Sequence, residues 1–474
     1  MADGRLHGGD GNEHVRLAPP SALLASASVL LTYLIGVELF RCRRIALIAA
    51  ALHAFNPSIT YLVHGYLFSD HIDVALLFWV ELSIWLLLRG LREGSTRWLI
   101  AAGVAQGVAY LCKTYPAFIV VLIALAAWPW WPQVKRWHIL VFLISAAATI
   151  LPWLLYCLIR FPREFQFEQF QVFRHLTHNV EQWAGPWDRV IFDFLLRIYN
   201  RFYPAVIVAT VLMFRAAWRE RNSNLGVLLV WALGVLIPFT LATSKTPSAT
   251  LMSWPAFYLL LAAMIVRAID GDALCLGGWV ASVVLAFLAA GKIPSQGWGY
   301  PNPPRFAGVM RENIWLLWHV LCALAAAIAM QALLRHRDKL NARRIILPLG
   351  IVAALASTYL LIRLVRLNII AVAENRTRPA FPQLAELSRT QLPPNAVLLL
   401  ENNEKLEHVV AMFYTGRSVY PVSPDTWRET ADKIEKAGGV PLLATRRNVD
   451  LTRALTEQVD GLNLYAVGTA PPNR

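Results

Sequence analysis

The chain has 474 residues, of which 57% are hydrophobic and 16% are charged, and its formal net charge is +14. A typical soluble protein carries about 25% charged residues, so this composition, with a mean hydropathy of +0.47, excludes an ordinary soluble protein. Nucleic-acid binding is also excluded, because the basic residues fall in short connections between apolar segments and form no patch with interleaved aromatic residues.

About twelve apolar segments follow one another, many of them near the length of roughly 20 residues that crosses a bilayer. Their predicted ranges are 20–39, 45–66, 72–89, 98–113, 115–131, 138–159, 200–214, 225–243, 252–267, 276–291, 314–334 and 345–366. The sequence therefore predicts an all-α polytopic membrane protein.

Basic residues gather in every second connection, at 41–44, 89–97, 135–136, 215–221, 267 and 335–344. Lys and Arg in short loops mark the cytoplasmic side of a membrane protein. The other connections are therefore predicted on the outer face, namely the N-terminus, 67–71, the neighbourhood of Lys113, 160–199, 244–251, 292–313 and the tail after 367. This pattern places the chain in the plasma membrane with a periplasmic working face.

Three regions follow from this topology. Residues 1–19 are interpreted as a remnant of an outer loop, 20–366 as the transmembrane domain, and 367–474 as a small periplasmic α/β domain. In the last region Ala396–Glu401, Gly439–Thr445 and Leu462–Val467 are predicted strands, and Asp425–Ala437 is a predicted helix.

The long 160–199 connection is predicted to contain a helix that lies in the membrane interface. Phe170, Phe173, Leu176 and Val180 recur at helical spacing, with polar residues between them. An amphipathic helix of this kind places its apolar face at the boundary between headgroups and acyl chains.

Ionisable residues at the outer ends of the spans are the candidates for chemistry, because charge near a bilayer is costly. Asp70 and Asp73 lie beside His64 and His71, and carboxylates next to imidazoles can hold a divalent metal ion. The structural alternative is that Ser69 or Asp70 caps the following helix.

Two lysines lie on the outer face, against the positive-inside trend. Lys113 precedes Pro116, and Lys245 follows Ser244 in SKTPSATLMSWP. A lysine there can bind a phosphate as a point charge or extend to the interface as an anchor. His175 and His178 in the 160–199 connection are either metal ligands or ordinary polar residues, and Glu81, near mid-depth of its span, is expected to pair inside the bundle.

The motifs of common soluble enzymes are missing from the sequence: there is no Walker A loop, dinucleotide-binding glycine fingerprint, GxSxG or HExxH. Since no nucleotide is expected outside the cell, these observations favour a lipid-borne substrate.

Four segments resemble the C-type glycosyltransferases (GT-C), in particular the branch of protein O-mannosyltransferases and the lipid A aminoarabinose transferase. They are VRLAPPSALLASASVLLTYLIGVELF, RRIALIAAALHAFNPSITYLVHGYLFSDHIDVALLFW, GVAYLCKTYPAFIV and SKTPSATLMSWPAFYLLLA, and the likeness covers about residues 14–265. The resemblance implies an inverting transferase that moves a sugar from a polyprenyl phosphate to a lipid, glycan or protein acceptor on the outer face.

The resemblance also implies roles for particular residues. The acidic site residue of the family falls on Asp70 or Asp73, and the donor phosphate would be bound by Lys113, Ser244 and Lys245. A metal-site histidine of some members corresponds to His178, so a divalent ion (Mg, Mn or Zn), with His71 as a second ligand, is expected.

In one respect this sequence departs from the family pattern. The family begins with a span and an outer loop that carries the presumed catalytic Asp, and this sequence starts after that Asp. Residues 8–21 look like the end of that loop, so we expect a chain truncated at its N-terminus and inactive or weak as written. Two alternatives stay open at this stage: a transporter or flippase of lipid-linked saccharide, and a catalytically dead membrane scaffold.

Overall fold

The computed structural model describes residues 13–63, 72–131, 134–178, 203–244, 247–288, 381–401, 407–449 and 454–467, together with 348, 351–352, 355–359, 362 and 366. The chain divides into two units. One is the membrane unit Val15–Val372, and the other contains Ala373–Arg474. Each unit is described by itself.

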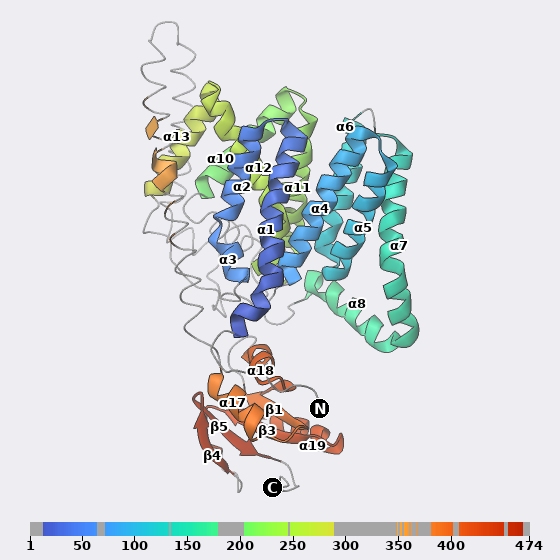
Figure 1. Cartoon of the computed structure of the whole chain (residues 1–474), viewed down its shortest axis with the longest axis vertical. Coiled ribbons are helices and arrows are strands. Elements are labelled where there is room, and N and C mark those ends of the chain that lie inside the picture. Colours follow the sequence, from blue (N-terminus) through green and yellow to red (C-terminus); the bar gives the residue numbers. More distant parts are fainter. Residues whose placement is uncertain are drawn as a thin grey trace. The chain divides into compact units, whose positions relative to one another are not determined.

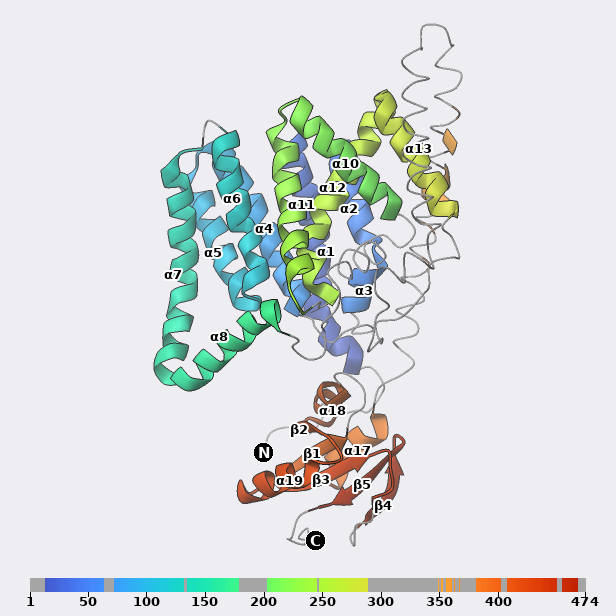
Figure 2. The same cartoon turned by 180° about the vertical axis from the view of Figure 1, so that it is seen from behind.

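Helices make up the membrane unit (Figures 1 and 2). They are α1 (Glu13–Phe40), α2 (Arg43–Ala54), α3 (Pro57–Val63), α4 (Ile72–Glu93), α5 (Thr96–Cys112), η1 (Tyr115–Phe118), α6 (Ile119–Trp130), α7 (Arg136–Arg160), α8 (Pro162–Thr177), α10 (Tyr203–Arg219), α11 (Ser223–Leu241), η3 (Pro247–Ser253), α12 (Trp254–Ile269) and α13 (Ala273–Leu288). Among the described residues, five helices are long and apolar enough to cross a membrane: Pro20–Phe40, Ile72–Glu93, Arg136–Arg160, Ser223–Leu241 and Thr250–Ile269.

The predicted spans up to residue 288 fall on these helices, with one correction. The range 45–66 is not one helix, because the chain breaks between α2 and α3 at Phe55 and Asn56. Pro57 explains the break: proline has no N–H to donate, and it disfavours the helical conformation of the residue before it. The predicted span 314–334 and most of 345–366 lie outside the described residues, so the total of about twelve spans stays a prediction.

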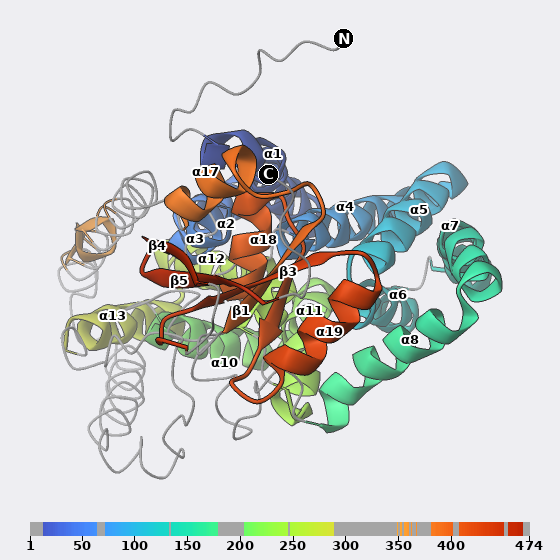
Figure 3. The ribbon, with the colours of Figure 1, turned by 90° about the horizontal axis from the view of Figure 1, so that it is seen from below.

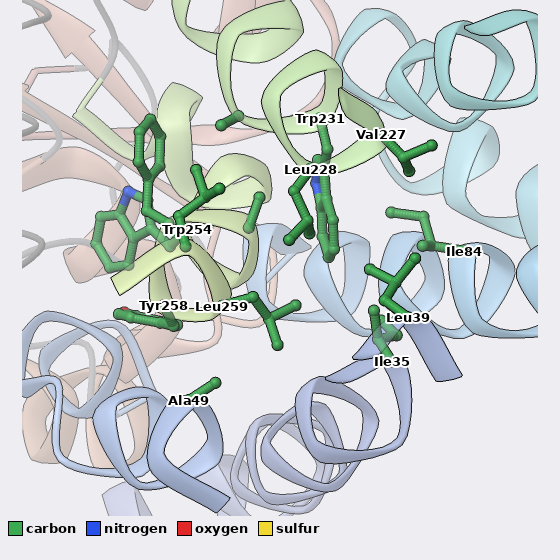
Figure 4. Close-up of a cluster of buried hydrophobic side chains, with 14 of the residues drawn as sticks. Ile35, Leu39, Ala49, Ile84, Val227, Leu228, Trp231, Trp254, Tyr258 and Leu259 are labelled. Atoms are coloured by element: carbon green, nitrogen blue, oxygen red, sulfur yellow. The ribbon is translucent and has the colours of Figure 1, made fainter. Parts of the chain in front are cut away.

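Helix α12 forms the centre of the unit and packs against α2, α10, α11 and α13. Its side chains are almost all buried, and Tyr258 and Leu259 lie near Trp231 of α11 in one apolar cluster (Figure 4). The indole N–H of Trp231 donates a hydrogen bond of 2.6 Å to the carbonyl of Met252. A buried Trp thus finds its polar partner at the irregular η3 segment, where carbonyls lack helical donors.

Close approach of α5 and α7 depends on two glycines of α5 spaced four residues apart. A Cβ atom on Gly103 would lie 2.4 Å from the carbonyl oxygen of Phe142, and one on Gly107 would lie 2.4 Å from Cβ of Thr149. Small residues at this spacing let membrane helices pack backbone to backbone. Helix α5 is therefore held between α4 and α7.

A buried polar cluster joins α1, α2 and α4 inside the apolar unit. The Thr32 hydroxyl donates to Oε1 of Glu81 at 2.6 Å and lies 2.7 Å from Nδ1 of His53. All three side chains are buried. A hydroxyl has one proton, so Thr32 accepts from His53, whose proton must lie on Nδ1. The expected pairing of Glu81 inside the bundle is confirmed, with Thr32 as its partner.

The cluster continues to α12 through neighbouring side chains. The Asn56 amide donates to the Tyr258 hydroxyl at 2.8 Å, and the His53 and Tyr258 rings lie 5.3 Å apart between centroids. Four helices and the α2–α3 break are thereby joined through polar groups that the bilayer cannot satisfy.

The second unit contains a five-stranded mixed sheet of order β2-β1-β3-β5-β4. Its elements are α17 (Pro382–Thr390), β1 (Ala396–Glu401), α18 (Glu407–Thr415), β2 (Val419–Val422), α19 (Trp427–Lys436), β3 (Val440–Thr445), β4 (Ala454–Val459) and β5 (Leu462–Ala466). Strand β1 is parallel to β2 and β3, whereas β5 is antiparallel to β3 and β4.

Alternation along β1 explains the layers of this unit. Leu398 and Leu400 join the apolar cluster that includes residues of α17 and α18, whereas Leu399 joins the cluster with Trp427 of α19. Successive side chains of a strand point to opposite faces, so helices cover both faces of the sheet. The three predicted strands are present as β1, β3 and β5, and α19 lies within the predicted helix. The periplasmic placement of the unit stays a prediction.

Substitution of Thr32 by Val tests the buried cluster, since Val keeps the shape and removes the hydroxyl. We expect the free energy of unfolding to fall by about 1–3 kcal/mol, because Glu81 and His53 lose a hydrogen bond where both side chains are buried. Thermal unfolding of the detergent-solubilised chain measures this.

The control is Thr210→Val on α10, where the hydroxyl donates to the carbonyl of Val206 in its own helix and little change is expected. Equal melting temperatures for both variants would show that the cluster contributes no stability.

Candidate functional site

An ion pair lies at one end of the α4–α5 helical hairpin. Asp73 is in the first turn of α4, and Lys113 directly follows α5. The two helices run antiparallel and are joined at their other end by the turn around Gly94, so both residues reach the same end. The Lys113 ammonium nitrogen lies 2.8 Å from Oδ1 of Asp73. The structure thus brings together two residues predicted from the sequence to be functional.

Local sequence determines where Lys113 lies. Its backbone is extended, with φ −158° and ψ 111°, and Pro116 in η1 prevents α5 from continuing into α6. Such a break leaves carbonyls without donors, and buried Gln106 supplies one: its amide donates to the carbonyl of Ala117 at 2.9 Å. The hydrogen bond of Gln106 therefore stabilises the break, and the break places Lys113 at the end of the hairpin.

The two members of the pair differ in exposure. The Asp73 side chain is 1% exposed and that of Lys113 is 33% exposed. A buried carboxylate requires a cation close by, because the low dielectric penalises an uncompensated charge. The N-terminal end of α4 contributes a favourable dipole to the same carboxylate. Asp73 thus fixes the ammonium group of a side chain that is one third exposed.

The end of α8 is joined to the segment after α11. Ser244 donates from Oγ to the carbonyl of His178 at 2.9 Å and from its backbone N–H to the carbonyl of His175 at 3.0 Å. Thr243 donates to the carbonyl of Leu176 at 2.9 Å. Figure 3 shows α8 extending from the end of α7 toward α11. These bonds satisfy carbonyls that the end of a helix leaves open, and they bring Ser244 and His178, two predicted site residues, together.

Helix α8 itself is the helix predicted in the 160–199 connection. Phe167, Phe170 and Phe173 are exposed on it, as the interfacial interpretation requires. The His178 ring has its Nδ1 atom 2.7 Å from the Thr177 hydroxyl. The roles predicted for Ser244 in phosphate binding and for His178 in metal binding stay predictions.

Several predicted site residues cannot be placed. Asp70, His71, His64 and Lys245 lie outside the described residues, as do Val180 and the rest of its connection up to residue 202. Within the described part of the chain, no group of three or more His, Cys, Asp or Glu side chains could hold a metal ion. The metal site expected at His71 and His178 therefore stays a prediction.

A groove that sequence analysis did not predict lies beside the break after Lys113. It has a volume of about 340 Å³, and its walls include Tyr110 and Thr114 on one side and Trp153 and Phe161 on the other. Glu164 and Glu168 of α8 also line it. No local sequence pattern predicts this groove, because its walls come from α5, α7 and α8. Its mainly apolar walls suit a lipid chain.

Comparisons with known proteins show similarity to membrane transferases. A family described as dolichyl-phosphate-mannose-protein mannosyltransferase matches residues 8–156. An undecaprenyl phosphate-alpha-4-amino-4-deoxy-L-arabinose arabinosyl transferase of Pseudomonas paraeruginosa is 29% identical over 291 residues, 58% of this chain and 50% of the relative. A transferase of the same name from Edwardsiella ictaluri is 25% identical over 348 residues, 66% of this chain and 59% of the relative. The chain spans about half the length of the curated relatives that it matches.

Among solved structures, the crystal structure of ArnT from Cupriavidus metallidurans bound to undecaprenyl phosphate superposes with a TM-score of 0.58. It is 16% identical, and the match covers 98% of this chain and 89% of that protein. The archaeal oligosaccharyltransferase AglB from Archaeoglobus fulgidus, in complex with an inhibitory peptide and a dolichol-phosphate, gives a TM-score of 0.50 at 13% identity over 91% of this chain and 58% of that protein. The predicted resemblance in sequence is confirmed by these relatives, and the chain shares the fold of the two solved structures.

Separate removal of the two charges tests the ion pair. We expect Lys113→Met to lower the free energy of unfolding by roughly 3 kcal/mol, because it leaves the Asp73 carboxylate buried without its cation. The double variant Asp73→Asn with Lys113→Met is expected to regain most of this loss, because no buried charge remains. Thermal unfolding in detergent compares the three proteins. A double variant no more stable than Lys113→Met alone would contradict the pairing.

Proposed function

We propose that this chain is a membrane glycosyltransferase that moves a sugar from a polyprenyl-phosphate donor to an acceptor on the outer face of the bacterial plasma membrane. The observation that carries the proposal is the Asp73–Lys113 pair, 2.8 Å between charged atoms, at the end of the hairpin opposite the arginine-rich turns. Support comes from the matched family and from the shared fold with a protein solved with undecaprenyl phosphate.

Lys113 is proposed to bind the donor phosphate. Its ammonium has three N–H donors, and the buried carboxylate of Asp73 holds it at one place while a third of the side chain stays exposed. A positioned cation stabilises negative charge that develops in a transition state without reorganising. We assign Asp73 to positioning Lys113, and the residues Ser244 and Lys245 stay predicted phosphate ligands.

The proposed reaction is a single displacement. An acceptor hydroxyl oxygen attacks the anomeric carbon on the face opposite the phosphate and forms the new glycosidic bond. The bond from the anomeric carbon to the phosphate oxygen breaks, and polyprenyl phosphate leaves with the electron pair. The hydroxyl proton passes to a general base. Lys113 stabilises the charge that the leaving phosphate gains.

A divalent ion remains a separate proposal, and no step above depends on one. The described residues do not fit a metal centre, since Asp73 contacts Lys113 and the His178 ring contacts Thr177. Asp70 and His71 are the predicted residues that a metal site would need in addition. The transporter alternative requires charges that line a path at mid-depth. Glu81 is fully buried and bonded to Thr32 instead.

Transfer of labelled sugar from synthetic polyprenyl-phosphate donors tests the function in proteoliposomes. We expect the double variant Asp73→Asn with Lys113→Met to lose about 10²–10³-fold in transfer rate, because the leaving phosphate loses its preorganised cation, although the protein stays folded.

The matched control removes another ion pair of the same unit, Glu220→Gln with Arg267→Met. Its oxygen–nitrogen distances are 2.6 Å, and the strong Arg267 hydrogen bond holds the pKa of Glu220 below its ordinary value. This control should retain transfer. Equal transfer by both double variants would remove Lys113 from the mechanism. No transfer from any donor, either by the chain as given or by a version extended upstream with a hydrophobic helix and an Asp-containing loop, would favour the transporter or scaffold.

A further inference from the structure

A second cavity lies at the opposite end of the membrane unit, where four helix ends meet. It has a volume of about 450 Å³ and is lined by the end of α1, the last turn of α4, the end of α6 and the start of α11. Figures 1 and 2 show these helix ends at the end of the unit away from α8. We infer that this cavity, called here the arginine cavity, binds the phosphodiester headgroup of an anionic phospholipid.

Hydrogen bonds between the helix ends fix the walls of the arginine cavity. The Trp131 indole donates to the Ser223 hydroxyl at 2.8 Å, and the Asn224 amide donates to the carbonyl of Leu39 at 2.8 Å. All four residues line the cavity. The start of α11 is thus tied to both α1 and the end of α6, so the site exists before a ligand arrives.

Charge in the arginine cavity is positive. Arg92 is paired with Glu38, with 2.7 Å between Nη1 and Oε1, and it also donates to the carbonyl of Glu38. Arg41 has no ion pair or side-chain hydrogen bond within the part of the chain that the structure describes. One guanidinium is therefore balanced by a carboxylate, and the other leaves a net positive charge in the cavity, next to the positive end of the α11 dipole.

The backbone of Arg41 adopts a conformation that glycine adopts in other turns at this end of the unit. Its φ is +50°, in the left-handed region, where a Cβ atom is sterically unfavourable and glycine is not. Two other turns at this end use glycine for a positive φ, Gly94 at +62° and Gly271 at +97°. Arg221 has a similar φ of +49° and does not line the cavity. The place of the Arg41 guanidinium in the cavity wall, and not the backbone strain, therefore supports a role in binding.

The neighbouring aromatic residues indicate a lipid as the source of the phosphate. Trp130 is 43% exposed at the rim while Trp131 is 6% exposed, and both line the cavity. Trp is enriched at the level of lipid headgroups, and basic cavities between membrane helices on the arginine-rich side bind anionic lipid headgroups. Guanidinium groups bind phosphate oxygens in a bidentate manner. This proposal does not depend on the proposed sugar transfer, since it concerns other residues.

Native mass spectrometry of the full chain in mild detergent tests the arginine cavity, with titrations of dioleoyl phosphatidylglycerol, dioleoyl phosphatidylcholine and inorganic phosphate. The test variant is Arg41→Gly, and the matched control is Arg221→Gly, because Arg221 also has a positive φ, +49°, and does not line the cavity. Both changes relieve the backbone, so both melting temperatures should stay or rise.

We expect Arg41→Gly to weaken phosphatidylglycerol binding by about five- to tenfold, while Arg221→Gly leaves it unchanged. A merely structural role of Arg41 would not separate lipid affinity from stability in this way. Equal loss in the two variants, or phosphatidylcholine bound as tightly as phosphatidylglycerol, would overturn the proposal. Arg41-dependent binding of inorganic phosphate without a preference for phosphatidylglycerol would overturn the assignment to a lipid.

Discussion

The bilayer gives a protein no hydrogen bonds, and the membrane unit depends on this constraint at each point where its helices are irregular or carry polar side chains. Where α5 stops, Gln106 supplies a donor to the carbonyl of Ala117. Where η3 precedes α12, Trp231 supplies one to Met252. These two side chains therefore lie at irregular backbone, and the candidate site lies at the first of these breaks, after α5.

The same constraint explains the difference between the two buried acids of α4. Glu81 and Asp73 are both buried on one helix. Glu81 has a hydroxyl partner inside the bundle, and Asp73 has an ammonium partner whose side chain is one third exposed. A neutral partner within the protein can only stabilise packing, whereas an exposed cation can also bind an anion. The chemistry proposed for this chain follows from that second arrangement.

Hydropathy predicted the described helices up to residue 288 well, because it is a local property of the sequence. The break within the predicted span 45–66 could also have been predicted, because Pro57 acts locally on the residue before it, Asn56. The Gly103 and Gly107 spacing could have predicted close packing of α5 against α7. The partners of the polar side chains were harder to predict, because they are far apart in the sequence. Lys113 contacts Asp73 across 40 residues, and Thr32 contacts Glu81 across 49. Neither pair has a sequence period that reveals it, so the sequence could name the candidates and not their partners.

The two ends of the membrane unit use different cations, and the difference has a physical reason. A guanidinium is planar and binds a phosphate through two parallel hydrogen bonds, which suits a lipid that stays bound. An ammonium is a compact, strongly hydrated point charge. In the proposed transfer the leaving polyprenyl phosphate must depart after each reaction, and interactions that bind the product as tightly as the transition state would slow turnover. Lys113, held by Asp73 and one third exposed, stabilises the developing charge without the bidentate hydrogen bonds that would retain the product.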